Sequence, residues 1–149
     1  MKVTNEVMPS DPKRIAEMQQ AGPAGPIVMV NLLKFREKAQ YPDGRDADLS
    51  GREAYQRYGR EVVRLLPKCG GRAIFAGDVR FLALGQVEEL WDEIAMAEYP
   101  NRAALWAMST SPEWQAIAVH RSAGLAGQLN IETTYALGFG AQDFTGRTG

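Results

Sequence analysis

The chain has 149 residues, of which 45% are hydrophobic and 23% are charged, an ordinary composition for one globular domain. Seventeen basic and eighteen acidic residues leave a net charge of −1, so nothing suggests binding to nucleic acid or to an anionic membrane. A single cysteine, Cys69, excludes an intramolecular disulfide, and a single histidine, His120, excludes a multi-histidine metal site within one subunit. No secretion signal or membrane span is recognised, so we expect a cytoplasmic protein.

The first 25 residues are predicted to form a helical arm ahead of the main domain. Ser10-Asp11-Pro12 is typical of a helix start, with Ser10 or Asp11 as the cap and proline near the first helical position. The segment from Gly22 to Pro26 holds two glycines and two prolines, so it ends this helix and allows an extended segment to begin.

The next segment, GPIVMVNLLKF from Gly25 to Phe35, is predicted to be the central strand of a sheet. A strand with one face in water alternates apolar and polar residues, but here both faces are apolar. One amide, Asn31, interrupts the apolar run. This strand therefore needs cover on both of its faces.

The rest of the chain is predicted to alternate helices with strands. A polar loop spans 36–50, helices span 51–66 and follow the caps Asn101 and Ser111, and strands span 72–85, 91–99 and 129–137. The last helix is expected to end at Gly127, and the two middle strands to form a hairpin across 86–90. The order is the split βαββαβ arrangement of ferredoxin-like folds. We predict an α+β protein with an antiparallel sheet: arm 1–25, ferredoxin-like domain 26–137 and a flexible tail 138–149.

Covering the second face of the sheet predicts a homodimer. A two-layer unit covers only one sheet face with helices, yet residues 27–35 and 79–85 carry apolar side chains on both faces. Burying each such side chain gains about 1.5–3 kcal/mol, so a face left in water is unfavourable. A second copy, packed sheet against sheet about a two-fold axis, is the simplest cover.

Several short motifs together resemble the domain of unknown function 1330 family, over about Pro26 to Tyr135. They are MVNLLKF (29–35), Glu53-Ala54-Tyr55 with Tyr58, Gly70-Gly71-Arg72, Trp91-Asp92, EYPNR (98–102), Ser111-Pro112 and His120-Arg121. The resemblance implies a dimeric α+β barrel in which two ferredoxin-like sheets face each other. It implies no particular chemistry, because the wider barrel superfamily includes monooxygenases, isomerases and haem enzymes.

His120 and Arg121 are the sharpest candidates for a site. Histidine titrates near neutral pH and arginine binds carboxylates through two hydrogen bonds, although neighbours on a helix point about 100° apart. Asp92 lies among apolar strand neighbours, so it is either the partner of an arginine or a base. The alternative for all three residues is a structural role, with each side chain satisfied by protein partners.

Other candidates are ligand-binding residues. Asn31 either satisfies neighbouring backbone groups or contacts a ligand. Tyr55 and Trp106 belong to an aromatic set that is either core or the wall of a cavity for a flat ligand. Arg102, just after the cap Asn101, could hold an acid group or be a surface cation.

These residues lead to one working hypothesis and one alternative. The hypothesis is a small-molecule-binding dimer for a carboxylic or aromatic metabolite. If it is an enzyme, we expect cofactor-free acid–base chemistry of the isomerase, decarboxylase or monooxygenase type. Its pocket would gather Asn31, Tyr55, Asp92, Arg102, His120 and Arg121, with His120 and Asp92 as catalytic groups and Arg121 as the anion holder. The alternative is a binding or structural module in which this polar cluster only stabilises the core and the dimer.

Overall fold

A computed structural model describes residue 6 and residues 9–136 of the chain. In chain order the elements are α1 (Pro12–Met18), β1 (Ile27–Phe35), α2 (Gly51–Leu65), the 3₁₀ helix η1 (Leu66–Cys69), β2 (Arg72–Asp78), β3 (Glu93–Tyr99), α3 (Arg102–Ser109), α4 (Pro112–Gly124) and β4 (Leu125–Thr133). The predicted tail, 138–149, lies outside the described residues. No helix in the described ranges is long and apolar enough to cross a membrane.

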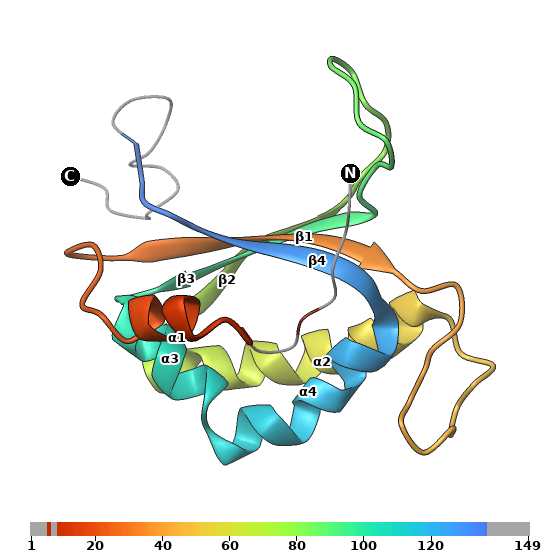
Figure 1. Cartoon of the computed structure of the whole chain (residues 1–149), viewed down its shortest axis with the longest axis horizontal. Helices are drawn as coiled ribbons and strands as arrows, with labels where there is room; N and C mark the ends of the chain where they lie inside the picture. Colours follow the sequence, from red (N-terminus) through yellow and green to blue (C-terminus); the bar gives the residue numbers. More distant parts are fainter. Residues whose placement is uncertain (1–5, 7–8, 137–149) are drawn as a thin grey trace.

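The four strands form one antiparallel sheet in the order β2-β3-β1-β4. Figure 1 shows α2, α3 and α4 together below this sheet, while the green hairpin between β2 and β3 rises above it. The strand order, with β1 central, is that of the ferredoxin-like fold. The predicted α+β, ferredoxin-like architecture is therefore confirmed.

The helices begin where their capping residues predict. Ser50 accepts a hydrogen bond from the Glu53 amide while the Glu53 carboxylate accepts one from the Ser50 amide, which makes a complete capping box for α2. Asp11, Asn101 and Ser111 cap α1, α3 and α4. In each, the side-chain oxygen accepts a hydrogen bond from a backbone amide of the first turn, without the return bond of a capping box. These short-range bonds explain why the starts could be read from the sequence.

The end of α4 differs from the prediction. The helix ends at Gly124 and not Gly127, and β4 runs over Leu125–Thr133 and not 129–137. Gly124 lies against α2, where an added Cβ would collide with the Gly51 carbonyl oxygen and sit 2.8 Å from the Tyr55 amide nitrogen. The chain turns to an extended backbone at Leu125 (φ −95°, ψ 127°), whose side chain is fully buried. A contact between two helices, not a local signal, sets this boundary.

The strands β2 and β3 are also shorter than predicted. Residues 79–92 leave the sheet, so the predicted strands 72–85 and 91–99 become Arg72–Asp78 and Glu93–Tyr99. The apolar residues of the connection project into solvent, with Phe81 75% and Leu84 91% exposed. Alternating apolar residues predicted a strand there, but beyond Asp78 no neighbouring strand of the described chain continues the pairing.

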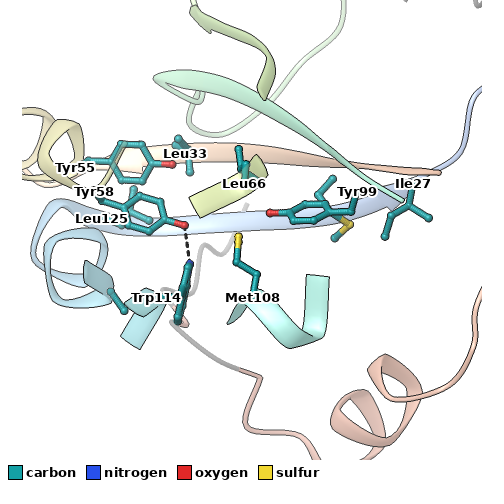
Figure 2. Packing of buried hydrophobic residues seen from close by; sticks show 11 residues of the cluster. Ile27, Leu33, Tyr55, Tyr58, Leu66, Tyr99, Met108, Trp114 and Leu125 are labelled. Carbon is teal, nitrogen blue, oxygen red and sulfur yellow. Dashed lines mark hydrogen bonds between the residues drawn. The ribbon is translucent and has the colours of Figure 1, made fainter. Parts of the chain in front are cut away.

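The main core lies between the sheet and the helices. Its largest fully buried side chains are Ile27, Leu33 and Leu125, joined by Met29 and Trp114. Figure 2 shows the side chains of the whole core cluster, which come from the strands β1, β3 and β4 and from the helices beneath them. The inner face of β1 is thus covered within one chain.

The outer face of the sheet is apolar too. Strand pairing places Val30 and Leu32 of β1 opposite Met96 and Ile94 of β3 on one side, and opposite Ile131 and Leu129 of β4 on the other. Ile131 and Leu129 are 44% and 41% exposed in the isolated chain. The two-sided apolar character of β1 is therefore real. Helices α2, α3 and α4 lie on the inner side of the sheet (Figure 1), and the outer face keeps these apolar side chains partly exposed.

Candidate functional site

A cavity of about 1550 Å³ lies between the inner face of the sheet and the helices. Strand residues Met29, Asn31, Glu93, Ala95, Tyr99 and Gln128 line its sheet side, and Tyr55, Tyr58, Leu66, Met108, Trp114 and Arg121 line its helix side. Residues of the N-terminal arm, including Glu6 and Met18, also contribute. The wall is mostly apolar with a few polar groups, which is the usual make-up of a small-molecule site.

Three tyrosine hydroxyls converge in this cavity. Figure 2 shows the Tyr99 hydroxyl pointing toward those of Tyr55 and Tyr58. The Tyr58 oxygen accepts a hydrogen bond from the Trp114 indole nitrogen at 3.1 Å. Within the described residues, the hydroxyls of Tyr55 and Tyr99 form no hydrogen bond to protein, although both side chains are buried. Hydroxyls that open onto a cavity in this way are available to a ligand or to ordered water.

All three tyrosines are held in their neutral form. Burial raises the pKa of Tyr55, and the neighbouring Tyr58 raises it further, whereas the Arg121 charge lowers it. Burial likewise raises the pKa of Tyr99 and of Tyr58, and again the Arg121 charge opposes the shift. The cavity therefore offers neutral O–H donors close to one positive charge.

Arg121 and Gln128 form the charged and amide part of the wall. Arg121 is only 7% exposed, lies with its guanidinium carbon 5.9 Å from the centre of the Tyr58 ring, and donates to the Gln128 side-chain oxygen. Gln128 donates to the backbone carbonyl of Glu6, and so does Arg121 at 3.4 Å. These bonds fasten the N-terminal segment to the cavity wall.

Asn31 faces the cavity from the middle of β1. Its amide nitrogen donates to the Ala95 carbonyl at 3.2 Å, and its oxygen accepts a bond of 2.7 Å from Asn130. Asn31 therefore satisfies neighbouring protein groups, as one alternative expected, and it also lines the cavity where the other alternative would place a ligand. The ligand contact predicted for it stays a prediction.

Glu93 is one of the carboxylates that line the cavity, together with Glu6, Glu17 and Glu132. It is the first residue of β3, on the same strand face as Ala95 and Tyr99. Its Oε2 accepts a long hydrogen bond of 3.4 Å from Arg52, which holds Asp78 more closely at 2.5 Å. Burial raises the pKa of Glu93; Arg52 opposes this shift and Asp78 adds to it. This raised pKa extends the pH range over which Glu93 carries a proton, which makes it a candidate for proton transfer.

His120 lies outside the cavity, beneath the 36–50 loop. Its Nδ1 is 2.7 Å from the hydroxyl of the buried Tyr41, whose oxygen also accepts a hydrogen bond of 3.2 Å from Arg57. The tautomer of His120 sets which of the two groups donates, because the Tyr41 oxygen can accept from Arg57 and still either donate to Nδ1 or accept from it. Burial lowers the pKa of His120, and the charges of Arg57 and Arg45 lower it further. The loop packs against α2 and α4, because its own residues Ala39 and Tyr41 are buried in a small cluster with Ala54 and Ala123.

Asp92 lies outside the cavity as well, and protein groups occupy its carboxylate. Oδ2 accepts a hydrogen bond of 2.8 Å from the Phe35 amide, and Oδ1 lies 3.3 Å from the Lys34 ammonium. The ion pair that was expected with an arginine is formed with a lysine instead. Asp92 thereby fixes the end of β1 against the start of β3.

Arg102 and Trp106 complete the predicted set. Arg102 borders the cavity, but it binds Glu132 through two hydrogen bonds of 2.7 Å and the Glu17 carbonyl at 2.9 Å, which ties α3 to β4 and α1. This pairing lowers the pKa of Glu132. Trp106 is half-buried on α3 and does not line the cavity. The expectation of one polar cluster is therefore wrong in geometry: Asn31, Tyr55, Arg102 and Arg121 meet at the cavity, whereas His120, Asp92 and Trp106 do not.

Sequence reasoning did not single out Glu93 or Gln128, and it considered Tyr58 and Tyr99 only as members of the aromatic set. Strand alternation carried the signal for Glu93 and Tyr99, because Glu93, Ala95, Ala97 and Tyr99 share one face of β3. Choosing between this face and the one with Ile94 and Met96 requires knowing which face the helices cover. Gln128 could not be found, because the predicted strand began one residue after it.

Comparison with known proteins places the chain in a family. Residues 46–133 match the model of the domain of unknown function DUF1330. A crystal structure of a protein of unknown function from Rhodopseudomonas palustris is 31% identical, covers 87% of this chain and 96% of its own, and has a TM-score of 0.75. A crystal structure of the methylated form of that protein is 32% identical, covers 92% and 98%, and has a TM-score of 0.79. No curated protein matches the chain. The chain belongs to the DUF1330 family.

Proposed function

We propose that the cavity between the sheet and the helices binds a small aromatic or carboxylic acid. One observation carries the proposal: the side chains of Tyr55 and Tyr99 are buried, yet their hydroxyls face a cavity of about 1550 Å³ and, in the described part of the chain, bond to no protein atom. Neutral tyrosines donate hydrogen bonds, so the complementary ligand group is an oxygen acceptor. The Arg121 charge favours an acidic acceptor, and the apolar wall favours a flat carbon skeleton.

A thermal-shift and calorimetry panel tests this function. Benzoate, 4-hydroxybenzoate and phenylacetate are the probes, and benzylamine, which is aromatic but lacks the acceptor, is the control. A ligand present at 100 times its Kd stabilises the folded state by about 2.7 kcal/mol, so melting should rise by several degrees with the acids only. Equal shifts with benzylamine, or no shift with any acid, would overturn the proposal.

Two matched variants locate the site. Tyr99→Phe removes a cavity hydroxyl and should weaken acid binding about tenfold, the effect of losing one ordinary hydrogen bond. Tyr135→Phe makes the same chemical change outside the cavity, where the hydroxyl donates to Glu98, and should leave the affinity unchanged. Equal losses in both variants would argue against this cavity.

Cofactor-free acid–base chemistry, of the isomerase, decarboxylase or monooxygenase type, is the second step of the proposal. Catalysis by His120 and Asp92 stays a prediction, and their saturated hydrogen bonds favour structural roles for both. The rival, a module that binds without chemistry, is distinguished by turnover: a ligand recovered unchanged from the protein supports it.

We further propose that the outer sheet face joins two copies of the chain. It carries a continuous apolar surface made by Val30, Leu32, Ile94, Met96, Leu129 and Ile131. The face is self-complementary in character, and burying it removes several large apolar side chains from water. Light scattering at micromolar concentration should give twice the 16.4 kDa chain mass, and Ile131→Lys should give a monomer. A monomeric wild-type protein would contradict the dimer.

A further inference from the structure

We propose that Glu93 is a general base of the cavity and that Tyr55 holds the oxygen of an enolisable carbonyl substrate while Glu93 moves its proton. This inference rests on the proposed function, since it needs an aromatic acid in the same cavity. It adds a substrate feature, a carbonyl group with a hydrogen on the adjacent carbon, and it moves the proton transfer from His120 and Asp92 to a different residue.

The position of Glu93 supports this role. Pairing with Leu33 of β1 directs it to the helix-covered face, where it lines the cavity beside Tyr55 and Ala95. In the described chain its Oε1 has no hydrogen-bond partner, and only the 3.4 Å bond from Arg52 reaches Oε2. A free carboxylate oxygen at a cavity wall can reach a substrate C–H group, which Asp92 cannot do from its clamp on Phe35 and Lys34.

Tyr55 supplies the second requirement of enolisation. Its hydroxyl has no hydrogen bond to a described protein group, and its side chain lines the same cavity as Glu93. Burial first, and then the neighbouring Tyr58 and Glu93, raise the pKa of Tyr55, so the phenol is neutral. A neutral O–H donor stabilises the negative oxygen that forms when the adjacent carbon loses its proton. Base and donor are thus on opposite walls, one from β3 and one from α2.

The reaction balances without a co-reactant. The Glu93 carboxylate takes the proton from the carbon next to the carbonyl, and the C–H electron pair becomes the carbon–carbon double bond of an enolate. The carbonyl π pair moves onto the oxygen, which accepts the Tyr55 hydrogen bond. The Glu93 acid then gives a proton back to carbon. Return to the same carbon regenerates the ketone and, once the acid has exchanged with water, replaces that hydrogen with one from solvent, whereas transfer to a conjugated carbon gives double-bond isomerisation.

The alternative is a purely structural role, in which Glu93 and Asp78 both form ion pairs with Arg52. The chain offers a matched control, because Asp78 binds the same arginine at 2.5 Å but does not line the cavity. Glu93→Gln and Asp78→Asn each replace one acid by its amide with little change of shape. A structural role predicts similar consequences for both, and a catalytic role predicts a loss for one.

The experiment follows exchange of the benzylic hydrogens of phenylpyruvate and 4-hydroxyphenylpyruvate for deuterium, by proton NMR in deuterated buffer against a protein-free blank. We expect wild-type protein to accelerate exchange and Glu93→Gln to lower the catalysed rate at least about 100-fold, the usual contribution of a general base. Asp78→Asn should stay within about threefold of wild type, and thermal shifts should show that both variants still bind the probe. The catalysed rate should rise with pH through a midpoint above the ordinary range of a glutamate, because the base acts as the carboxylate.

The possible negative results distinguish failure of the Glu93 inference from failure of the proposed binding function. Binding of a probe without faster exchange, or equal losses in both variants, overturns the inference and leaves the binding function standing. Binding of benzoate but of neither keto acid overturns the inference in the same way. Failure of the keto acids and of the benzoate panel together overturns both the inference and the binding function.

Discussion

The cavity and the region beneath the 36–50 loop both contain buried polar side chains, but these side chains differ in whether protein groups bond to them. Under the loop, Tyr41 bonds His120 and Arg57, and Arg57 bonds Asp46 at 2.8 Å. In the cavity, the hydroxyls of Tyr55 and Tyr99 bond to no described protein group. The difference teaches that residue type alone does not show which polar groups are open to a cavity: the histidine bonds to a protein partner, whereas the hydroxyls of two tyrosines face the cavity without one among the described residues.

Removing a carboxylate whose two oxygens both bond to protein groups should have the largest effect on stability. Asp92→Ala removes a charged acceptor from the Phe35 amide and from Lys34, so the free energy of unfolding should fall by about 2 kcal/mol. Glu89→Ala, which removes an exposed partner of the same lysine, should change it by less than about 0.5 kcal/mol. Urea unfolding measures both, and comparable losses would contradict the clamp described for Asp92.

Removing the shared hydroxyl beneath the loop should come next. Tyr41→Phe deletes the bonds to His120 and Arg57 inside a packed site, and we expect a loss of about 1–2 kcal/mol in the same urea experiment. A neutral outcome would mean that water replaces the hydroxyl and that the loop is less tightly packed than its burial indicates.

The protonation of His120 should give a smaller, pH-dependent effect. Its folded-state pKa lies below the ordinary value of 6.5, so between these two values the unfolded chain binds more protons. Stability should therefore fall as pH drops through 6.5 and stop falling below the folded-state pKa. His120→Gln keeps a group that can accept from Tyr41 but cannot titrate, so its stability should be flatter over this window. Parallel profiles from pH 8 to pH 5 would contradict this.

The smallest effect is expected in the cavity. Tyr99→Phe removes a hydroxyl with no described protein partner, so stability should change by less than about 0.5 kcal/mol. Tyr58→Phe is the matched test, because it leaves the Trp114 indole nitrogen unsatisfied and should cost about 1 kcal/mol. Thermal unfolding of the two variants without ligand compares them, and an equal cost would show that the Tyr99 hydroxyl is satisfied after all.

Much of the fold could be predicted because its causes are local. Ser50, Asn101 and Ser111 cap helices through bonds to residues only a few positions away, and the start of each helix follows from them. The site was predictable only in part. The structure brings Asn31, Tyr55, Arg102 and Arg121 to the cavity, whereas His120 and Asp92, grouped with them by chemical type, lie elsewhere. Ligand binding by any of them stays a prediction.

By itself, the sequence determined the order of strands and helices and the apolar character of both faces of β1, because periodicity and capping act over a few residues. Only the tertiary structure decided which face of β3 the helices cover, and a shift of one residue puts Glu93 in the cavity and Asp92 outside it. It also decided where α4 ends, through the contact of Gly124 with Gly51. Such outcomes depend on contacts between segments far apart in the chain, which no local pattern encodes.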